Sequence, residues 1–172
     1  MRRILLVIDM QNDFIDGVLG SKEAVSIVSD VAKRIAEFDG EVVFTRDTHF
    51  DGYLQTQEGR KLPVPHCIKD TYGWQISDKL PVPAGARIFD KEAFGSTELA
   101  SILRSENESN KISEIELVGL CTDICVISNA FLLKAALPEC EISVNRQLCR
   151  GVSSESHENA LRSMAACQIN II

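Results

Sequence analysis

Apolar residues along the chain follow two alternating patterns. Short runs of consecutive apolar residues are typical of strands that are covered on both faces, and apolar residues at every third or fourth position are typical of helices. Val25, Val28 and Val31 follow the helical spacing, for example, and an Asp-Gly pair then ends that helix. The pattern predicts strands over residues 4–8, 41–45, 87–89, 115–118, 141–144 and 168–172, and helices over residues 25–38, 97–105, 123–137 and 155–166.

Alternating strands and helices predict a parallel sheet with helices on both faces. We therefore expect a single α/β domain over residues 1–172, Rossmann-like, with three α/β/α layers around a mostly parallel six-stranded sheet. Residues 46–86 interrupt the alternation, because they hold all of the five prolines except Pro138 and several glycines. We interpret this region as a long functional loop or an insertion.

Charge and cysteine content narrow the function classes. A net charge of -7 and a pI near 5.0 argue against nucleic acid or an anionic membrane as a partner. No stretch approaches the roughly 20 apolar residues of a membrane span, and Asp9 comes too early for the apolar core of a signal peptide. Six cysteines in a chain able to bury a core indicate reduced thiols, so we expect a cytoplasmic location.

Chemically active side chains follow three of the predicted strands. The first strand ends in Asp9, the third runs into Lys91, and the fourth ends in a turn that holds Cys121 and Cys125. Ligands of parallel sheets bind beyond the carboxyl ends of the strands, so these side chains should converge on one edge. A thiol, a carboxylate that removes its proton and a cation that stabilises the thiolate suit nucleophilic catalysis.

Other interpretations of these residues stay open. Buried cysteines are more often small hydrophobic residues, an aspartate after a strand often caps a turn, and a lone lysine is usually solvated. Cys121 and Cys125 lack further cysteines at zinc-site spacing, and a reducing compartment disfavours a disulfide between them. We also expect Thr122 to cap the following helix and the start of that helix to lower the pKa of the Cys125 thiol.

The loop after the second strand contains a candidate metal site. Asp47 and His49 lie at its start, and His66 lies further along it. One carboxylate and two imidazoles suit a divalent ion such as zinc, manganese or iron. The alternative is that Asp47 caps a turn and that both histidines are surface residues.

Three motifs together resemble the isochorismatase-like cysteine hydrolases, a superfamily that includes nicotinamidases. They are VIDMQNDF at 7–14, FDKEAFGST at 89–97 and GLCTDICV at 119–126, and CRGVSSESHENAL at 149–161 resembles the closing helix of that family. The resemblance covers essentially the whole chain in the order of the family. It implies the isochorismatase-like fold and a catalytic triad of Asp9, Lys91 and Cys125.

The resemblance also implies a mechanism. Asp9 accepts the thiol proton, Lys91 favours the thiolate, and Cys125 attacks an amide carbonyl to form a thioester that water hydrolyses. The backbone N–H groups of Cys121 and Cys125 form the oxyanion hole, oriented by a cis peptide bond between Leu120 and Cys121. The implied reaction is hydrolysis of nicotinamide, or of a similar small carboxamide such as pyrazinamide, to the acid and ammonia.

Two other functions stay open beside that one. The first is another hydrolase of the superfamily that cleaves a different small amide, a ureido compound or an enol ether. The second is a non-catalytic member that binds a metabolite or a partner protein on the same fold, although such a protein needs no thiol nucleophile. Relatives in this superfamily are often dimers or larger, which implies a homo-oligomer.

The set of Asp47, His49 and His66 resembles the nicotinamidase metal site, which implies a bound divalent ion, zinc or else manganese or iron. The sequence departs from that branch at Thr48, where nicotinamidases usually have tryptophan. Among the aromatic residues, Phe14 in the first motif is the better candidate for a wall of the substrate pocket. Trp74 is the weaker candidate, and each of the two could instead belong to the core.

Overall fold

The centre of the molecule is a six-stranded sheet in the order β3-β2-β1-β4-β5-β6. The computed structural model describes residues 2–172. All five neighbouring strand pairs are parallel, so the sheet is parallel throughout, where the sequence predicted a mostly parallel one. The strands are β1 (Arg2–Ile8), β2 (Glu41–Asp47), β3 (Arg87–Lys91), β4 (Ile112–Leu120), β5 (Glu141–Arg150) and β6 (Asn170–Ile171).

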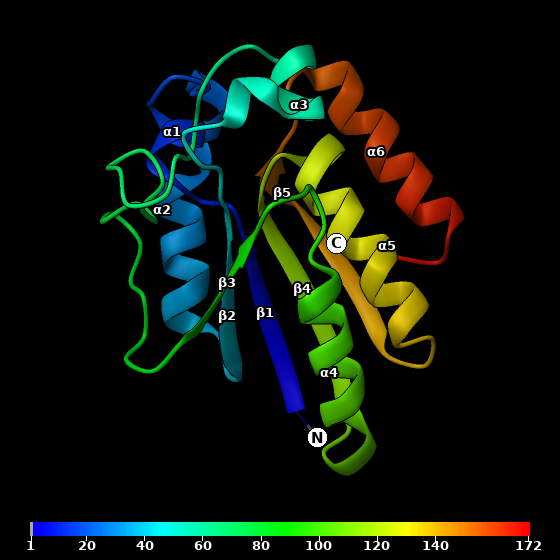
Figure 1. Cartoon of the computed structure of the whole chain (residues 1–172). Coiled ribbons are helices and arrows are strands. Elements are labelled where there is room, and N and C mark those ends of the chain that lie inside the picture. The colour runs from blue at the N-terminus through cyan, green and yellow to red at the C-terminus, as the bar shows by residue number, and fades with distance from the viewer. Residues whose placement is uncertain (1) are drawn as a thin grey trace.

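Helices cover both faces of this sheet, which confirms the predicted α/β/α layers (Figure 1). One face is covered by α2 (Lys22–Glu37). The other face is covered by α4 (Thr97–Ser109), α5 (Ile127–Ala136) and α6 (Ser154–Ala166). Along β1, Leu5 and Val7 pack toward α2, while Ile4 and Leu6 pack toward the other helices, and all four are fully buried. Burial of each such side chain stabilises the fold by about 1.5–3 kcal/mol.

The irregular region between β2 and β3 folds back over the carboxyl ends of the strands. It contains two short helical segments, η1 (Tyr53–Gln55) and α3 (Gln57–Lys61), and α3 lies above the strand ends in Figure 1. Two isolated bridges hold the region in place, one between Gln11 and Ile76 and one between His49 and Ile68. Gln11 belongs to the segment between β1 and the short helix α1 (Asn12–Ile15). This arrangement brings residues of the long loop to the edge where β1, β3 and β4 end.

Within residues 2–172, the structure has no helix that combines the length and the apolar character needed to cross a bilayer.

Gly119, near the end of β4, is required by a close approach between strands. Its φ is +119°, and a Cβ added there would lie 2.1 Å from the carbonyl oxygen of Ile8. Gly85 has a φ of +80° but open space around it, so it is a matched control. We expect Gly85→Ala to cost about 1–2 kcal/mol of unfolding free energy from backbone strain alone. Gly119→Ala should cost more than about 3 kcal/mol because the strand must also move.

Urea unfolding of both variants measures the difference. Equal losses at the two positions would show that crowding against Ile8 plays no part.

Candidate functional site

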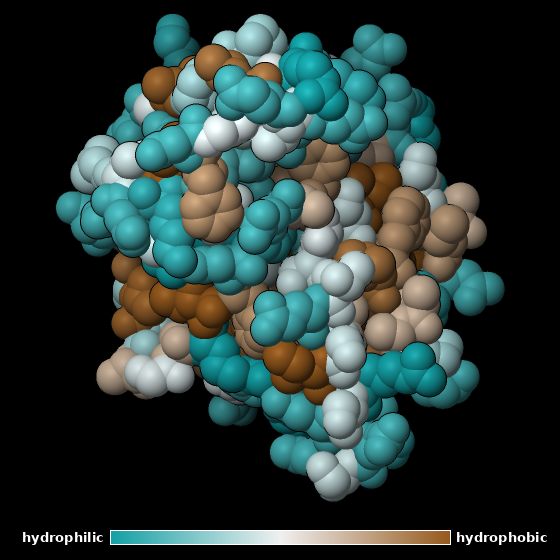
Figure 2. All heavy atoms as spheres, in the orientation of Figure 1, coloured by the Kyte–Doolittle hydropathy of each residue, from teal (hydrophilic) through white to brown (hydrophobic). Residues whose placement is uncertain are grey.

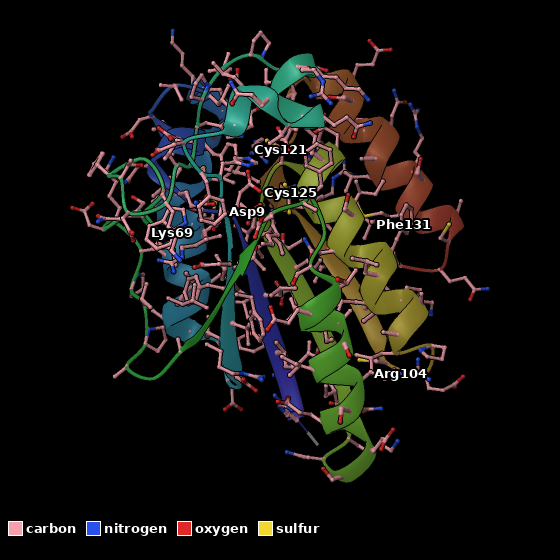
Figure 3. All side chains as sticks on the ribbon, in the orientation of Figure 1. Asp9, Lys69, Arg104, Cys121, Cys125 and Phe131 are labelled. Atoms are coloured by element: carbon pink, nitrogen blue, oxygen red, sulfur yellow. The ribbon has the colours of Figure 1, made fainter. Side chains whose placement is uncertain are left out.

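The three residues predicted to be catalytic meet at the carboxyl edge of the sheet. Asp9 directly follows β1 with a φ of +46°, Lys91 is the last residue of β3, and Cys125 lies in a one-turn π-helix, η2 (Thr122–Val126), after β4. Figure 3 shows Asp9, Cys121 and Cys125 close together above the ends of β1 and β4. The lysine side chain reaches this point past β2, which separates β3 from β1.

The Lys91 ammonium is the centre of this cluster. Its Nζ lies 2.6 Å from Asp9 Oδ2, 3.2 Å from Asp47 Oδ1 and 3.6 Å from Cys125 Sγ. The Thr45 hydroxyl donates a hydrogen bond of 2.6 Å to the other oxygen of Asp9. All five side chains are buried, and Asp9 is fully so. The arrangement can therefore move a proton between a thiol and a carboxylate beside a fixed positive charge.

Burial and the neighbouring charges shift the pKa values of this cluster. Burial raises the pKa of Cys125 well above its usual range, and the nearby Asp9 carboxylate raises it further, while Lys91 opposes both. Burial also raises the pKa of Asp9, against the attraction of Lys91. For Lys91, burial opposes the charge, but Asp9, Cys125 and Asp47 outweigh it and raise its pKa. The expected lowering of the Cys125 pKa is thus wrong, because burial and the Asp9 carboxylate outweigh the attraction of Lys91.

The cysteine turn is fastened to the last long helix. The peptide bond between Leu120 and Cys121 is cis, as the family resemblance implied. Thr122 was expected to cap a helix, but its hydroxyl lies 2.8 Å from Nδ1 of His157 in α6. Burial lowers the pKa of His157, which favours the neutral imidazole that can accept this bond. The contact holds the segment between the two cysteines against α6.

Four side chains beside this cluster form a group that could hold a metal ion. They are the three predicted residues and Glu58 in α3, and their ligand atoms all lie within 4.8 Å of one another. Asp47 Oδ2 lies 3.0 Å from His49 Nε2 and 3.5 Å from His66 Nε2. Glu58 Oε1 lies 3.5 Å from His49 Nε2 and 3.7 Å from His66 Nε2.

The chemistry of these four residues fits a divalent cation. His49 Nε2 is buried and makes no hydrogen bond to any of the described residues, although Asp47 is near. His66 Nδ1 lies 2.8 Å from the Val64 carbonyl, so Nδ1 carries the hydrogen and Nε2 is free to bind a metal. Burial opposes a charge on His49, yet the nearby carboxylates of Asp47 and Glu58 raise its pKa to about 9. The group attracts positive charge, and two imidazoles with two carboxylates are ordinary ligands of zinc, manganese and iron.

Glu58 was missing from the residues expected from the sequence. It lies in α3, a five-residue helix within the region whose pattern predicted no regular structure. The available signal was a local one: Thr56 caps α3 by accepting a hydrogen bond of 2.9 Å from the Gly59 N–H, which places Glu58 in the first turn. That signal predicts a helix start but not its place above the histidines.

A cavity of about 900 Å³ connects the two clusters. The four metal-site residues and both cysteines of the turn line it, and Phe14 lines it as expected, with its ring centroid 5.5 Å from that of His66. Trp74 does not line the cavity, so its expected place in the pocket is corrected. The Arg46 guanidinium covers its ring at 3.6 Å, and its Nε1 donates a hydrogen bond of 2.9 Å to the Thr48 hydroxyl.

Comparisons with known proteins agree with this geometry. The isochorismatase domain family matches residues 3–172. The nicotinamidase/pyrazinamidase of Mycobacterium tuberculosis is 27% identical over 185 residues, covering 99% of this chain and 98% of that protein. An uncharacterized isochorismatase family protein of Bacillus subtilis is 32% identical over 182 residues, covering 96% and 95% of the two chains. The structure of the Pyrococcus horikoshii pyrazinamidase in complex with zinc superposes with a TM-score of 0.84 and 28% identity, covering 100% and 99%.

Replacement of Glu58 tests the geometry of the metal group. Glu58→Ala should weaken zinc binding at least about tenfold, because a carboxylate facing both imidazoles is lost. Glu92→Ala is the matched control, since Glu92 lines the same cavity but does not belong to the group of four. Isothermal titration of the metal-free protein with zinc measures both affinities. Equal affinities for the two variants would remove Glu58 from the site.

Proposed function

The chain belongs to the isochorismatase family, and we propose that it is a metal-containing cysteine amidohydrolase that converts nicotinamide to nicotinate and ammonia. A similar small carboxamide such as pyrazinamide would react in the same way. One observation carries the proposal: a single buried ammonium, Lys91, contacts the candidate nucleophile Cys125, its candidate base Asp9 and the metal-site residue Asp47. The similarity to proteins named nicotinamidase and pyrazinamidase supports the substrate class.

The acylation step begins with transfer of the Cys125 proton to Asp9. The sulfur attacks the amide carbonyl carbon, and a C–S bond forms while the carbonyl oxygen takes up negative charge. We assign the stabilisation of this oxygen to the backbone N–H groups of Cys121 and Cys125. Asp9 then returns the proton to the nitrogen, the C–N bond breaks, and ammonia leaves. Lys91 keeps its charge throughout and balances the carboxylate of Asp9.

Water completes the reaction by hydrolysing the thioester. Asp9 takes a proton from a water molecule, which attacks the thioester carbonyl. The C–S bond breaks, the proton passes to the sulfur, and the carboxylic acid leaves. One base therefore serves both half-reactions, which is consistent with its complete burial and its two fixed partners, Thr45 and Lys91.

We propose that Asp47, His49, Glu58 and His66 hold the metal ion, and that this ion is zinc. When bound, it supplies a Lewis acid that can orient the ring nitrogen of the substrate. The zinc complex of the similar Pyrococcus horikoshii pyrazinamidase supports the choice of metal. Phe14 offers an aromatic wall beside His66 for a flat ring. The homo-oligomeric state and the cytoplasmic location stay predictions from the sequence.

Ammonia release from nicotinamide tests the proposed function. Cys125→Ala should lower kcat/KM at least about 10³-fold, because it removes the thiol that lies beside Lys91 and its partner Asp9. Removal of the metal with a chelator should abolish turnover, and zinc should restore it. Cys140→Ala is the matched control, because Cys140 is equally buried but does not line the cavity.

Absence of nicotinamide turnover by correctly folded, metal-loaded protein would reject nicotinamide as the substrate. Turnover that survives Cys125→Ala would reject the mechanism.

A further inference from the structure

We infer that the preferred substrates of this site are primary carboxamides whose acyl part carries a neutral, apolar extension beyond a single ring. The inference rests on the proposed function, because it takes Cys125 as the nucleophile. It goes further in stating which side of the amide is extended and what chemistry the extension has.

The size of the cavity is the first argument. Pockets of about 300–1,000 Å³ enclose drug-sized ligands, and this cavity of about 900 Å³ lies near the upper end of that range. A single-ring amide that contacts both Cys125 and the metal group fills only the inner part. The remaining volume continues outward to the surface beneath α3, where Figure 2 shows apolar residues gathered in a hollow.

The outer part of the cavity is lined mainly by apolar side chains. Leu19 and Ile124 form part of the wall, and four large apolar residues surround the mouth, each from a different segment of the chain. We call these four the apolar rim. Their exposed fractions lie between 38% and 71%, so the rim leaves much apolar surface in water. The apolar rim consists of Phe50, Leu62, Phe94 and Val152.

The few charged residues of the cavity do not favour a substrate whose extension is ionic. Outside the metal group, the charged residues that line the cavity are Lys61 and Glu92, one of each sign. Recognition of a phosphate or carboxylate usually requires several donors or an arginine fork, and none of the arginines that the structure describes lines this cavity. A neutral extension buries apolar surface at the rim without leaving a charge unpaired.

The position of Asp9 determines which side of the amide is extended. In the proposed mechanism Asp9 delivers a proton to the leaving nitrogen, so the nitrogen must face this carboxylate. Asp9 and Lys91 do not line the cavity, and their exposed fractions are 0% and 4%. The nitrogen side therefore faces buried side chains, which disfavours a substituent on that nitrogen. The acyl side faces the open cavity.

A matched substrate series tests the inference on the zinc-loaded wild-type protein. The series contains nicotinamide, its derivatives with a propyl or phenyl group on the ring edge remote from the nitrogen and the carboxamide, a derivative of equal length that ends in a carboxylate, and N-methylnicotinamide. We expect kcat/KM to rise about two- to fourfold for each buried methylene, mostly through KM. The carboxylate-tipped compound should show no such gain, and the N-methyl amide should react at least about tenfold more slowly than nicotinamide.

Variants of the rim supply the second measurement. Leu62→Ser and Phe94→Ser should each lower the ratio of kcat/KM for the phenyl derivative over nicotinamide by about fivefold. Val82→Ser should leave the ratio unchanged, because Val82 is also exposed (43%) but does not line the cavity. Thermal unfolding of each variant checks its fold.

The possible failures are distinguishable. Turnover of nicotinamide without a gain from apolar extensions would overturn this inference and leave the proposed function intact. Failure to release ammonia from any of the amides would overturn both. A wild-type dimer that the rim variants dissociate, together with no gain, would mean that a second copy of the chain covers the rim instead.

Discussion

Both clusters depend on the ion pairs that the Lys91 ammonium forms with Asp9 and Asp47. An isolated charge at 4% exposure would cost several kcal/mol, so it requires the two carboxylates beside it. Asp9 comes from the end of β1 and Asp47 from the end of β2, and the strand order β3-β2-β1 brings both within reach of the β3 side chain. The thiol cluster and the metal group therefore share one cation. A change of charge in one cluster therefore alters the electrostatic environment of the other.

The first sequence motif holds the metal loop as well as the candidate base. The side-chain amide of Gln11 accepts a hydrogen bond of 2.7 Å from the Asp47 N–H and donates one of 2.8 Å to the Asp47 carbonyl. Two residues further on, Asp13 accepts a hydrogen bond of 2.7 Å from the Cys67 N–H, directly after His66. The segment that begins with Asp9 thus fixes the backbone at two of the candidate metal ligands. One short motif therefore connects the candidate base to the candidate metal group.

The sequence could predict the residues whose positions depend on the order of strands and helices, but not those whose positions depend on the path of a loop. Asp9, Lys91 and Cys125 end or follow parallel strands, so the topology of the sheet was sufficient to bring them together. The position of Glu58 depends on the path of a loop whose sequence has no periodic pattern. The Trp74 side chain contacts Arg46 and Thr48 instead of the cavity, and sequence spacing does not predict these contacts. The prediction of a lowered pKa for Cys125 was wrong for a related reason. The helix start acts locally, whereas burial comes from the whole fold and outweighs it.

The balance of charge connects the metal to the chemistry of the thiol. Metal binding requires neutral imidazoles, and the carboxylates of Asp9, Asp47 and Glu58 then face the single ammonium of Lys91, which leaves an excess of negative charge in a largely buried site. Such an excess is costly in a medium of low dielectric constant, and the raised pKa of His49 is one expression of it. A divalent cation held by this group would offset that excess. It would also reduce the negative charge around Asp47 that attracts Lys91.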